Sequence, residues 1–281
     1  MAPRVVRAVG GYGNRRNDVV ISDNFATASS PRTVVYFGGD IQDLDEVMQQ
    51  QPECHPFLFW SLENTVEIVQ ESFPNSRIVA VRPSRKQDVL YSCFDNFVLS
   101  SPQISPSAYS PNFHALQHLD LILSNLKQRL GIEGLEERDE EIILIGFSKG
   151  CVVLNQLVHD ITAQCAVMHG ACAPSEDRDG PRLLRTMREM HWVDCGHWGP
   201  VEFYVADPNL LTSLRDLRIE VHVVTSPYQT KNPARPDYLP QLQRFCDVCK
   251  ELGVLKSHQH LFEHDKISIE RHFQTLKEIK Q

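Results

Sequence analysis

The sequence predicts an α/β fold in which a mostly parallel central sheet is covered by helices on both faces within a single domain. Short apolar runs alternate along the chain with segments of helical periodicity. The strongest runs are apolar at every position, as strands buried on both faces are. No repeat and no break in composition divides the 281 residues, and large α/β folds reach this length as one domain.

The expected strands are short runs rich in Val and Ile. Thr33–Phe37 leads into Gly38-Gly39-Asp40, and Arg77–Val81 is stopped by Pro83. Ile142–Ile145 is apolar throughout, which is typical of a strand in the middle of a parallel sheet. The other expected strands are Val19–Ile21, His191–Val193, Ile219–Thr225 and Leu261-Phe262.

Helices are expected where apolar residues recur every three or four positions. Phe113–Leu130 shows this spacing most clearly, and Ser268 is expected to cap a last helix that runs from Ile269 to Lys280. The other expected helices are 62–72, one that starts near Lys149, and Tyr238–Leu252, which Gly253 ends. The stretch 100–111 holds three prolines among five serines and is expected to be a loop.

The first 17 residues are expected to form a flexible tail or a short transit segment. They hold Arg4, Arg7, Arg15 and Arg16 but no acidic residue, which is the charge bias of a mitochondrial targeting segment. Residues 18–281 form the expected domain. Within it, residues 160–188 are expected to be an exposed insertion, because they include a charged stretch with Pro and Gly up to Gly180.

Composition excludes several functional classes. The longest apolar runs are four or five residues, whereas a membrane span needs about 20, so no span is expected. The 28 Lys and Arg against 36 Asp and Glu give a net charge of −8, which argues against nucleic acid as a partner. The eight cysteines lack the tight spacing of a small secreted disulfide framework, so a reducing compartment is expected.

Neither a metal nor a cofactor is expected. Cys246 and Cys249 form a lone C-x-x-C pair, and a structural zinc site would need a second pair. His114 and His118 lie one helical turn apart but lack a third ligand. The sequence contains no G-x-x-x-x-G-K-[ST] nucleotide loop and no H-E-x-x-H motif.

The pattern that carries chemistry is Gly146-Phe147-Ser148-Lys149-Gly150, a G-x-S-x-G motif between a strand and a helix. A sharp turn there exposes the serine hydroxyl at the helix N-terminus. Side chains at Gly146 and Gly150 would clash with the neighbouring strand and helix, which explains why both are glycine. We therefore expect Ser148 to be a nucleophile. The alternative is a tight turn with a capping serine.

A nucleophilic serine needs an oxyanion hole, a pair of N–H groups that stabilise the oxyanion. One donor is the backbone N–H of the following residue, Lys149. The other is expected from the loop after an earlier strand, where Gly39 and Asp40 follow Thr33–Phe37.

The general base and its acid are expected later in the chain, since the order in such enzymes is Ser, acid, His. Among the four histidines past residue 255 we expect His272, with His264 as the alternative base. For the acid we expect Asp194, because it follows His191–Val193 at the strand end where ligand-facing residues gather. Asp237 is the alternative acid. A chain without a functional acid also remains open.

Several of these segments together resemble the chromosome 2 open reading frame 69 family, from about Arg15 to the end of the chain. The segments that carry the resemblance are Tyr36–Gln42, Gly146–Cys151 with Val153–Leu157, His191–His197, Pro227–Gln229 and Ser268–Phe273. The resemblance implies an α/β-hydrolase fold, a serine hydrolase or esterase activity without a settled substrate, and residence in mitochondria. It matches Ser148 to the family's nucleophile and His272 to its C-terminal His-Phe element. The short Arg-rich start and the extra stretch from about Asp160 to Arg188 depart from the family.

Two functions of different kinds follow. The first is a serine hydrolase that acts on a small ester or thioester through a Ser-His-Asp triad and an acyl-enzyme. The second is a catalytically weak or inactive hydrolase-fold scaffold that regulates a protein partner in mitochondrial metabolism. An acyltransferase with the same serine chemistry is a third possibility. Outside mitochondria, the cytoplasm is the expected compartment.

Overall fold

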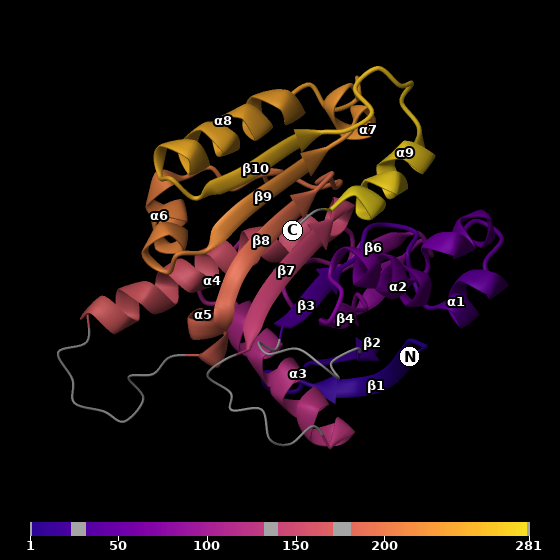
Figure 1. Cartoon of the computed structure of the whole chain (residues 1–281), viewed down its shortest axis with the longest axis horizontal. Helices are drawn as coiled ribbons and strands as arrows, with labels where there is room; N and C mark the ends of the chain where they lie inside the picture. The colour runs from indigo at the N-terminus through magenta and orange to yellow at the C-terminus, as the bar shows by residue number, and fades with distance from the viewer. Residues whose placement is uncertain (1, 24–31, 132–139, 171–180, 280–281) are drawn as a thin grey trace.

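The structure is a computed structural model, and it describes residues 2–23, 32–131, 140–170 and 181–279. Its centre is an eight-stranded sheet with the order β1-β2-β4-β3-β7-β8-β9-β10 (Figure 1). From β4 to β10 all neighbouring strands are parallel, whereas β2 is antiparallel to both β1 and β4. The predicted α/β architecture with a mostly parallel sheet is confirmed.

The strands of the large sheet include every strand expected from the sequence except the last. They are β1 (Arg4–Gly10), β2 (Arg16–Asp23), β3 (Arg32–Phe37), β4 (Arg77–Val81), β7 (Glu141–Phe147), β8 (Met187–Val193), β9 (Glu220–Thr225) and β10 (Leu255–His260). A separate two-stranded sheet pairs β5 (Arg85–Gln87) with β6 (Tyr91–Cys93).

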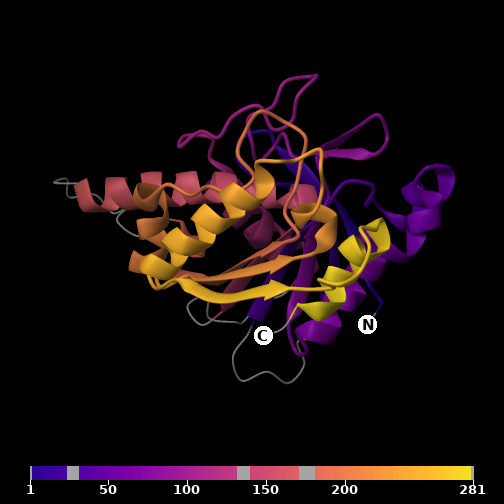
Figure 2. The same cartoon turned by 90° about the horizontal axis from the view of Figure 1, so that it is seen from above.

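Helices cover both faces of the sheet, as Figure 2 shows with α4 on one side and α2 and α9 on the other. The longer helices are α2 (Leu62–Ser72), α3 (Ala115–Leu130), α4 (Cys151–Gly170), α6 (Pro208–Asp216) and α8 (Tyr238–Glu251). The shorter ones are α1 (Asp45–Gln50), α5 (Arg182–Thr186), α7 (Pro227–Thr230) and α9 (Ile269–Gln274), with 3₁₀ turns η1 (His55–Trp60), η2 (Ser148–Gly150) and η3 (Thr275–Glu278).

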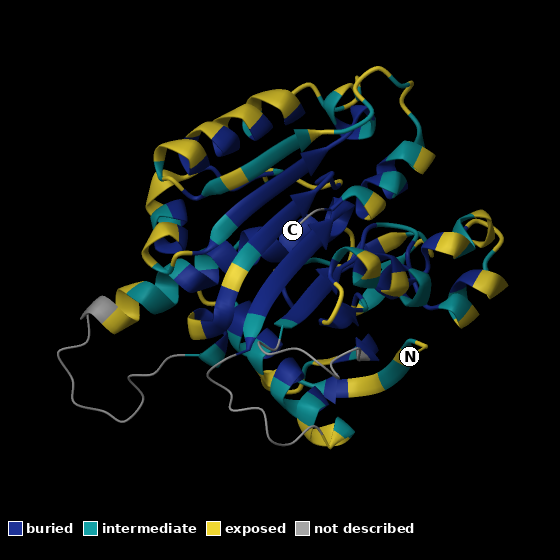
Figure 3. Ribbon diagram, in the orientation of Figure 1, coloured by how far each residue is buried: buried dark blue, intermediate teal, exposed yellow. Residues whose placement is uncertain are grey.

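Two hydrophobic cores lie on the opposite faces of the sheet. One core joins the sheet to α3, α4, α6 and α8, and the other joins it to α2, α9 and η3. The central strands supply side chains to both cores: Val34 faces one and Val35 the other. These strands are therefore buried along almost their whole length (Figure 3), which explains their continuous apolar runs.

Three expectations about chain segments were wrong. The N-terminal residues form β1 at the edge of the sheet instead of a flexible tail, because Asp18 and Arg129 hold the polar side of this strand. The last strand is Leu255–His260, not Leu261-Phe262; every residue after Leu255 in this edge strand is polar, so it contains no apolar run that would indicate a strand. The expected insertion begins inside α4, where Asp160 is buried; its part from 171 to 180 lies outside the described residues.

No helix in the described part of the chain is both long and apolar enough to cross a membrane.

Candidate active site

The turn after β7 holds Ser148 in a constrained backbone conformation. Ser148 has φ = 52°, in the left-handed region that side chains other than glycine seldom adopt. A Cβ on Gly150 would lie 2.0 Å from the carbonyl oxygen of Phe37, and one on Gly146 would lie 2.8 Å from Cα of Cys151. Glycine is thus required at both positions because the turn packs directly against neighbouring backbone.

The loop after β3 passes close to this serine. A Cβ on Gly39 would lie 2.8 Å from Cβ of Ser148, so only glycine lets the loop approach the hydroxyl this closely. The N–H of Gly39 is not free, because it donates to Oε1 of Gln42 over 2.9 Å. Gly39 was expected to belong to the oxyanion hole, but its N–H is already bonded, and what the structure shows is the close approach of its backbone to Ser148.

Gln42 is a buried residue that shapes this loop, and the motif analysis gave it no role. Its Oε1 also accepts from the hydroxyl of Tyr36 over 2.7 Å. Its amide nitrogen donates to the carbonyl of Trp60 and to the hydroxyl of Thr65, both over 2.9 Å. All of these partners are buried, so one side chain fixes the loop to two elements of the fold.

Two backbone N–H groups remain beside Ser148. Lys149 lies in the first turn of a helical segment, where N–H groups have no intrahelical partner. The N–H of Asp40 donates no hydrogen bond within the described residues. The side chains of these two residues lie 3.9 Å apart as an ion pair, and the Asp40 carboxylate accepts from the N–H of Ser92. Burial raises the pKa of Asp40.

His272 and Asp194 meet although 78 residues separate them in the sequence. His272 lies on α9, whose first turn is capped by the Ser268 hydroxyl, as expected. Its Nδ1 lies 2.6 Å from Oδ2 of Asp194, which follows β8 and is completely buried. Asp194 has φ = 43°, a conformation that Asp tolerates better than most residues. Ser226 donates to the same carboxylate from its N–H over 2.7 Å and from its hydroxyl over 2.5 Å.

The imidazole of His272 lies between two aromatic rings. The rings of Phe147 and Tyr228 stack on it at centroid distances of 4.5 Å each. Because Phe147 directly precedes Ser148, this stacking brings the imidazole beside the turn. Ser148 is 7% exposed, and its hydroxyl has no hydrogen-bond partner in the part of the chain that is described. A hydrogen bond between a catalytic serine and its histidine is often long or poorly aligned before substrate binds.

The alternative residues lie elsewhere. His264 is exposed in the loop before α9, and Asp237 is exposed at the start of α8. Neither has a contact with His272 or Asp194 among the described interactions. Gln229, which occupies the position past β9 where an acid is usual, is buried and accepts a hydrogen bond from Arg235. The geometry therefore favours His272 and Asp194 over the alternatives.

A cleft of ≈ 520 Å³ opens beside the turn. Lys149 lines it together with Tyr91, Ile104 and Trp198, whose side chains are each more than a third exposed. Gln87, Gln103 and Ser105 also line the cleft, so its surface is mixed polar and apolar, and Lys149 connects it to the turn that holds Ser148.

Both ring nitrogens of His118 have hydrogen-bond partners within the fold. Its Nδ1 accepts from the N–H of Tyr12 over 3.0 Å, and its Nε2 lies 2.9 Å from Oδ1 of Asn17. Burial lowers the pKa of this histidine to about 4. Both ring nitrogens thus hold the turn between β1 and β2. His114, at the N-terminus of α3, stacks on the ring of Tyr12.

Comparison with known proteins identifies relatives over most of the chain. A family model described as C2orf69 matches residues 5–141 and 135–255. "Mitochondrial protein C2orf69" of Homo sapiens is 30% identical over 85% of this chain and 72% of its own length. The homologue of Danio rerio is 31% identical over 87% of this chain and 72% of its own length.

Solved structures with little sequence identity share the fold. The enterobactin esterase of Shigella flexneri matches with a TM-score of 0.51 and 10% identity, over 99% of this chain and 58% of that chain. A dienelactone hydrolase from Anabaena variabilis gives a TM-score of 0.49 and 7% identity, over 99% of this chain and 95% of that chain. The expected α/β-hydrolase-like fold is confirmed, and at such identity the likeness establishes the fold alone.

Proposed function

The chain belongs to the C2orf69 family, and from this premise we propose that it is a serine hydrolase that cleaves an ester or thioester through an acyl-enzyme. One observation carries the proposal. The hydrogen bond between His272 and the buried Asp194 orients an imidazole that stacks on the residue before Ser148. A buried carboxylate that fixes a histidine beside a strained serine is the arrangement of an activated nucleophile.

The steps follow from the geometry. The Ser148 hydroxyl attacks the substrate carbonyl while its proton passes to Nε2 of His272, and the imidazolium that forms is stabilised by Asp194. The N–H groups of Lys149 and Asp40 stabilise the oxyanion. The tetrahedral intermediate then collapses and expels the leaving group, which takes the proton from His272. In the second half of the reaction His272 accepts a proton from water as the water attacks the acyl-serine. The second tetrahedral intermediate releases the acid, and the proton passes from His272 back to the Ser148 oxygen.

The cleft beside Lys149 has the volume of an ordinary small-molecule site. Tyr91, Trp198 and Ile104 supply apolar walls, and Gln87, Gln103 and Ser105 supply polar groups. A small acyl group is expected to lie against the apolar side chains, with the polar groups left for the rest of the substrate.

We place the protein in mitochondria because the relatives carry that location in their names. Two of the four N-terminal arginines, Arg4 and Arg7, lie in β1 and so give no separate support for a targeting segment.

The test is hydrolysis of short-chain p-nitrophenyl esters and of an acyl thioester by the purified chain and by its Ser148→Ala variant. We expect turnover by the parent and background rates for the variant. The fold should persist, since the hydroxyl has no hydrogen-bond partner in the described chain and its loss leaves no buried group unpaired. A Ser148→Ala variant that hydrolyses as fast as the parent would exclude the proposal. A folded parent that turns over none of these substrates would favour the scaffold function.

A further inference from the structure

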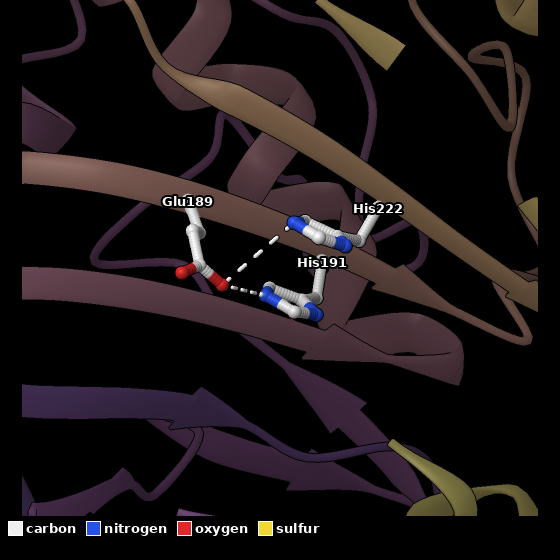
Figure 4. A group of neighbouring side chains, drawn as sticks. All are labelled: Glu189, His191 and His222. Atoms are coloured by element: carbon white, nitrogen blue, oxygen red, sulfur yellow. Dashed lines mark hydrogen bonds and ion pairs between the residues drawn. The ribbon is translucent and has the colours of Figure 1, made fainter. Parts of the chain in front are cut away.

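A second cluster of ionisable side chains lies on β8 and β9, on the same face of the sheet as α9. It contains Glu189, His191 and His222 (Figure 4). Glu189 and His191 are two residues apart on β8, so their side chains point to the same face of the sheet. His222 on β9 pairs with His191 across the parallel strands. One oxygen of Glu189 and one ring nitrogen of each histidine all lie within 4.8 Å of one another.

The contacts in this cluster leave one buried nitrogen without a partner. Nε2 of His191 lies 2.8 Å from Oε2 of Glu189, a normal hydrogen bond. Nε2 of His222 lies 3.7 Å from the same oxygen, too far for a hydrogen bond, and has no hydrogen-bond partner among the residues that the structure describes. His222 is 6% exposed, so water does not readily satisfy this nitrogen. An unpaired polar atom at such burial calls for a ligand or a functional explanation.

Ser257 holds His222 in an orientation that suits metal binding. Nδ1 of His222 lies 2.9 Å from the Ser257 hydroxyl, so an N–H on Nδ1 can donate to it and leave a lone pair on Nε2. Histidines that bind metals are usually oriented by such a second hydrogen bond.

The pairing of the two strands also favours a cation. Glu189 lies directly opposite Glu220, and His191 lies directly opposite His222. Two carboxylates in direct cross-strand pairing repel each other unless a positive charge intervenes. Lys256 supplies that charge to Glu220 over 3.1 Å. The carboxylate of Glu189 is oriented toward the two histidines, and the charge of Arg32 acts on it from a longer distance.

We propose that Glu189, His191 and His222 bind one Zn²⁺ ion, which clamps β8 to β9. Two imidazole nitrogens and one carboxylate are a ligand set that zinc takes in proteins, with water or a further oxygen in the fourth position. Glu220 lies 3.9 Å from Nε2 of His222 and can supply that oxygen.

The distances define the adjustment that binding requires. Zinc bonds of about 2.0–2.2 Å in a tetrahedron separate two ligand atoms by about 3.3–3.5 Å. The 3.7 Å separation between His222 and Glu189 is close to this value, whereas the 2.8 Å hydrogen bond of His191 must open. The two rings stack in parallel at 4.2 Å, and since a metal lies near the plane of each ligating ring, they must tilt toward each other.

The experiment titrates chelator-treated, dialysed full-length protein with Zn²⁺ by calorimetry and with Co²⁺ by absorption. We expect one Zn²⁺ per chain, a raised thermal midpoint, and the visible absorption of tetrahedral Co²⁺. His222→Gln should weaken the affinity by roughly 10²-fold or more, because loss of even an outer-shell partner costs 10–100-fold. The matched control is His258→Gln on β10, which pairs with Val223 and so points to the opposite face of the sheet; it should bind as the parent does.

Absence of stoichiometric binding by the parent would overturn the proposal, as would equal affinity in the His222→Gln variant. Binding through thiols would also contradict the proposal, and sulfur-to-cobalt charge-transfer absorption would reveal it. Cys246 and Cys249 are the two cysteines that lie closest to each other in the sequence. If His222→Gln does not fold, Ser257→Ala retains all three ligands and removes only the second hydrogen bond of His222. It should lower the Zn²⁺ affinity by roughly 10–100-fold, and an unchanged affinity would refute the site.

Discussion

Replacement of Asp194 by Asn tests the proposed triad through its most connected member. The carboxylate accepts three hydrogen bonds: two from Ser226 and one from Nδ1 of His272. Asparagine has nearly the same shape and also tolerates the left-handed backbone at this position. One amide oxygen can still accept from the N–H of Ser226. The amide nitrogen then replaces Oδ2 and donates where the carboxylate accepted.

The consequence falls on the tautomer of His272. A donor opposite Nδ1 favours the imidazole whose proton is on Nε2, and this form cannot accept the proton of Ser148. The negative charge that stabilises the imidazolium is also lost. We expect kcat for a p-nitrophenyl ester to fall by roughly 10³–10⁴, as for orienting acids in other triads, which is about 4–5.5 kcal/mol of transition-state stabilisation.

The assay compares kcat and KM of the parent, Asp194→Asn and the control Asp237→Asn, with circular dichroism to verify the fold. KM should change little, because Asp194 is buried behind His272 and has no contact with the cleft among the described residues. Retention of more than a tenth of the parent kcat by a folded Asp194→Asn would refute the role of this residue, as would a large loss in Asp237→Asn.

Three further predictions follow from the packing and the pKa values. Gly150→Val should give no folded protein, because its Cβ would lie 2.0 Å from the carbonyl oxygen of Phe37; soluble yield and circular dichroism measure this. Gln42→Ala should lower kcat about tenfold or more with little change in KM, because the loop that contains Gly39 loses its anchor; steady-state kinetics measure this. The pKa of His118 is about 4 in the folded protein against 6.5 in the unfolded chain, so the free energy of unfolding should fall as the pH drops from 6.5 toward 4. Urea unfolding at pH 7 and pH 5 measures this fall, and His118→Gln should make it smaller by about 2 kcal/mol.

Controls separate these effects from general damage. Gly10→Ala adds a Cβ only 3.4 Å from a side-chain atom of Asn125, an ordinary contact, and should fold normally. A Gln42→Ala variant with the kcat of the parent would show that the loop holds its position without this side chain. An unchanged pH dependence in folded His118→Gln would mean that other buried histidines, such as His197, account for the acid sensitivity; burial lowers the pKa of His197 to about 4 as well.

The central strands were predictable because their environment is uniform. β3, β4 and β7 are buried on both faces, so apolar residues occupy most positions in unbroken runs and the pattern is unambiguous. The edge strands β1 and β10 hold polar residues among or after their apolar ones and are mostly exposed or half-buried. Their sequences resemble loops, since what makes them strands is the partner strand and not their own composition.

The candidate site divides in a similar way. Ser148 and its glycines are recognisable because a sharp turn between a strand and a helix imposes local requirements on three positions. Asp194 and His272 could be proposed from chain order and strand ends, but only folding brings them within 2.6 Å. Ser226 and Gln42 had no local signal, since they act on groups far away in the sequence. The cluster of Glu189, His191 and His222 was missed because it depends on the register of β8 against β9.

Fluorophosphonate labelling of Ser148 tests the central claim most directly. The account predicts a covalent adduct that mass spectrometry locates on the peptide containing Ser148. Labelling should be abolished in Ser148→Ala and slowed by at least roughly 10³-fold in His272→Ala, because the hydroxyl then loses its base. His264→Ala should label at the rate of the parent. Absence of labelling in the folded parent, under conditions where a control hydrolase reacts, would contradict the account, and so would labelling of His272→Ala at the parent rate.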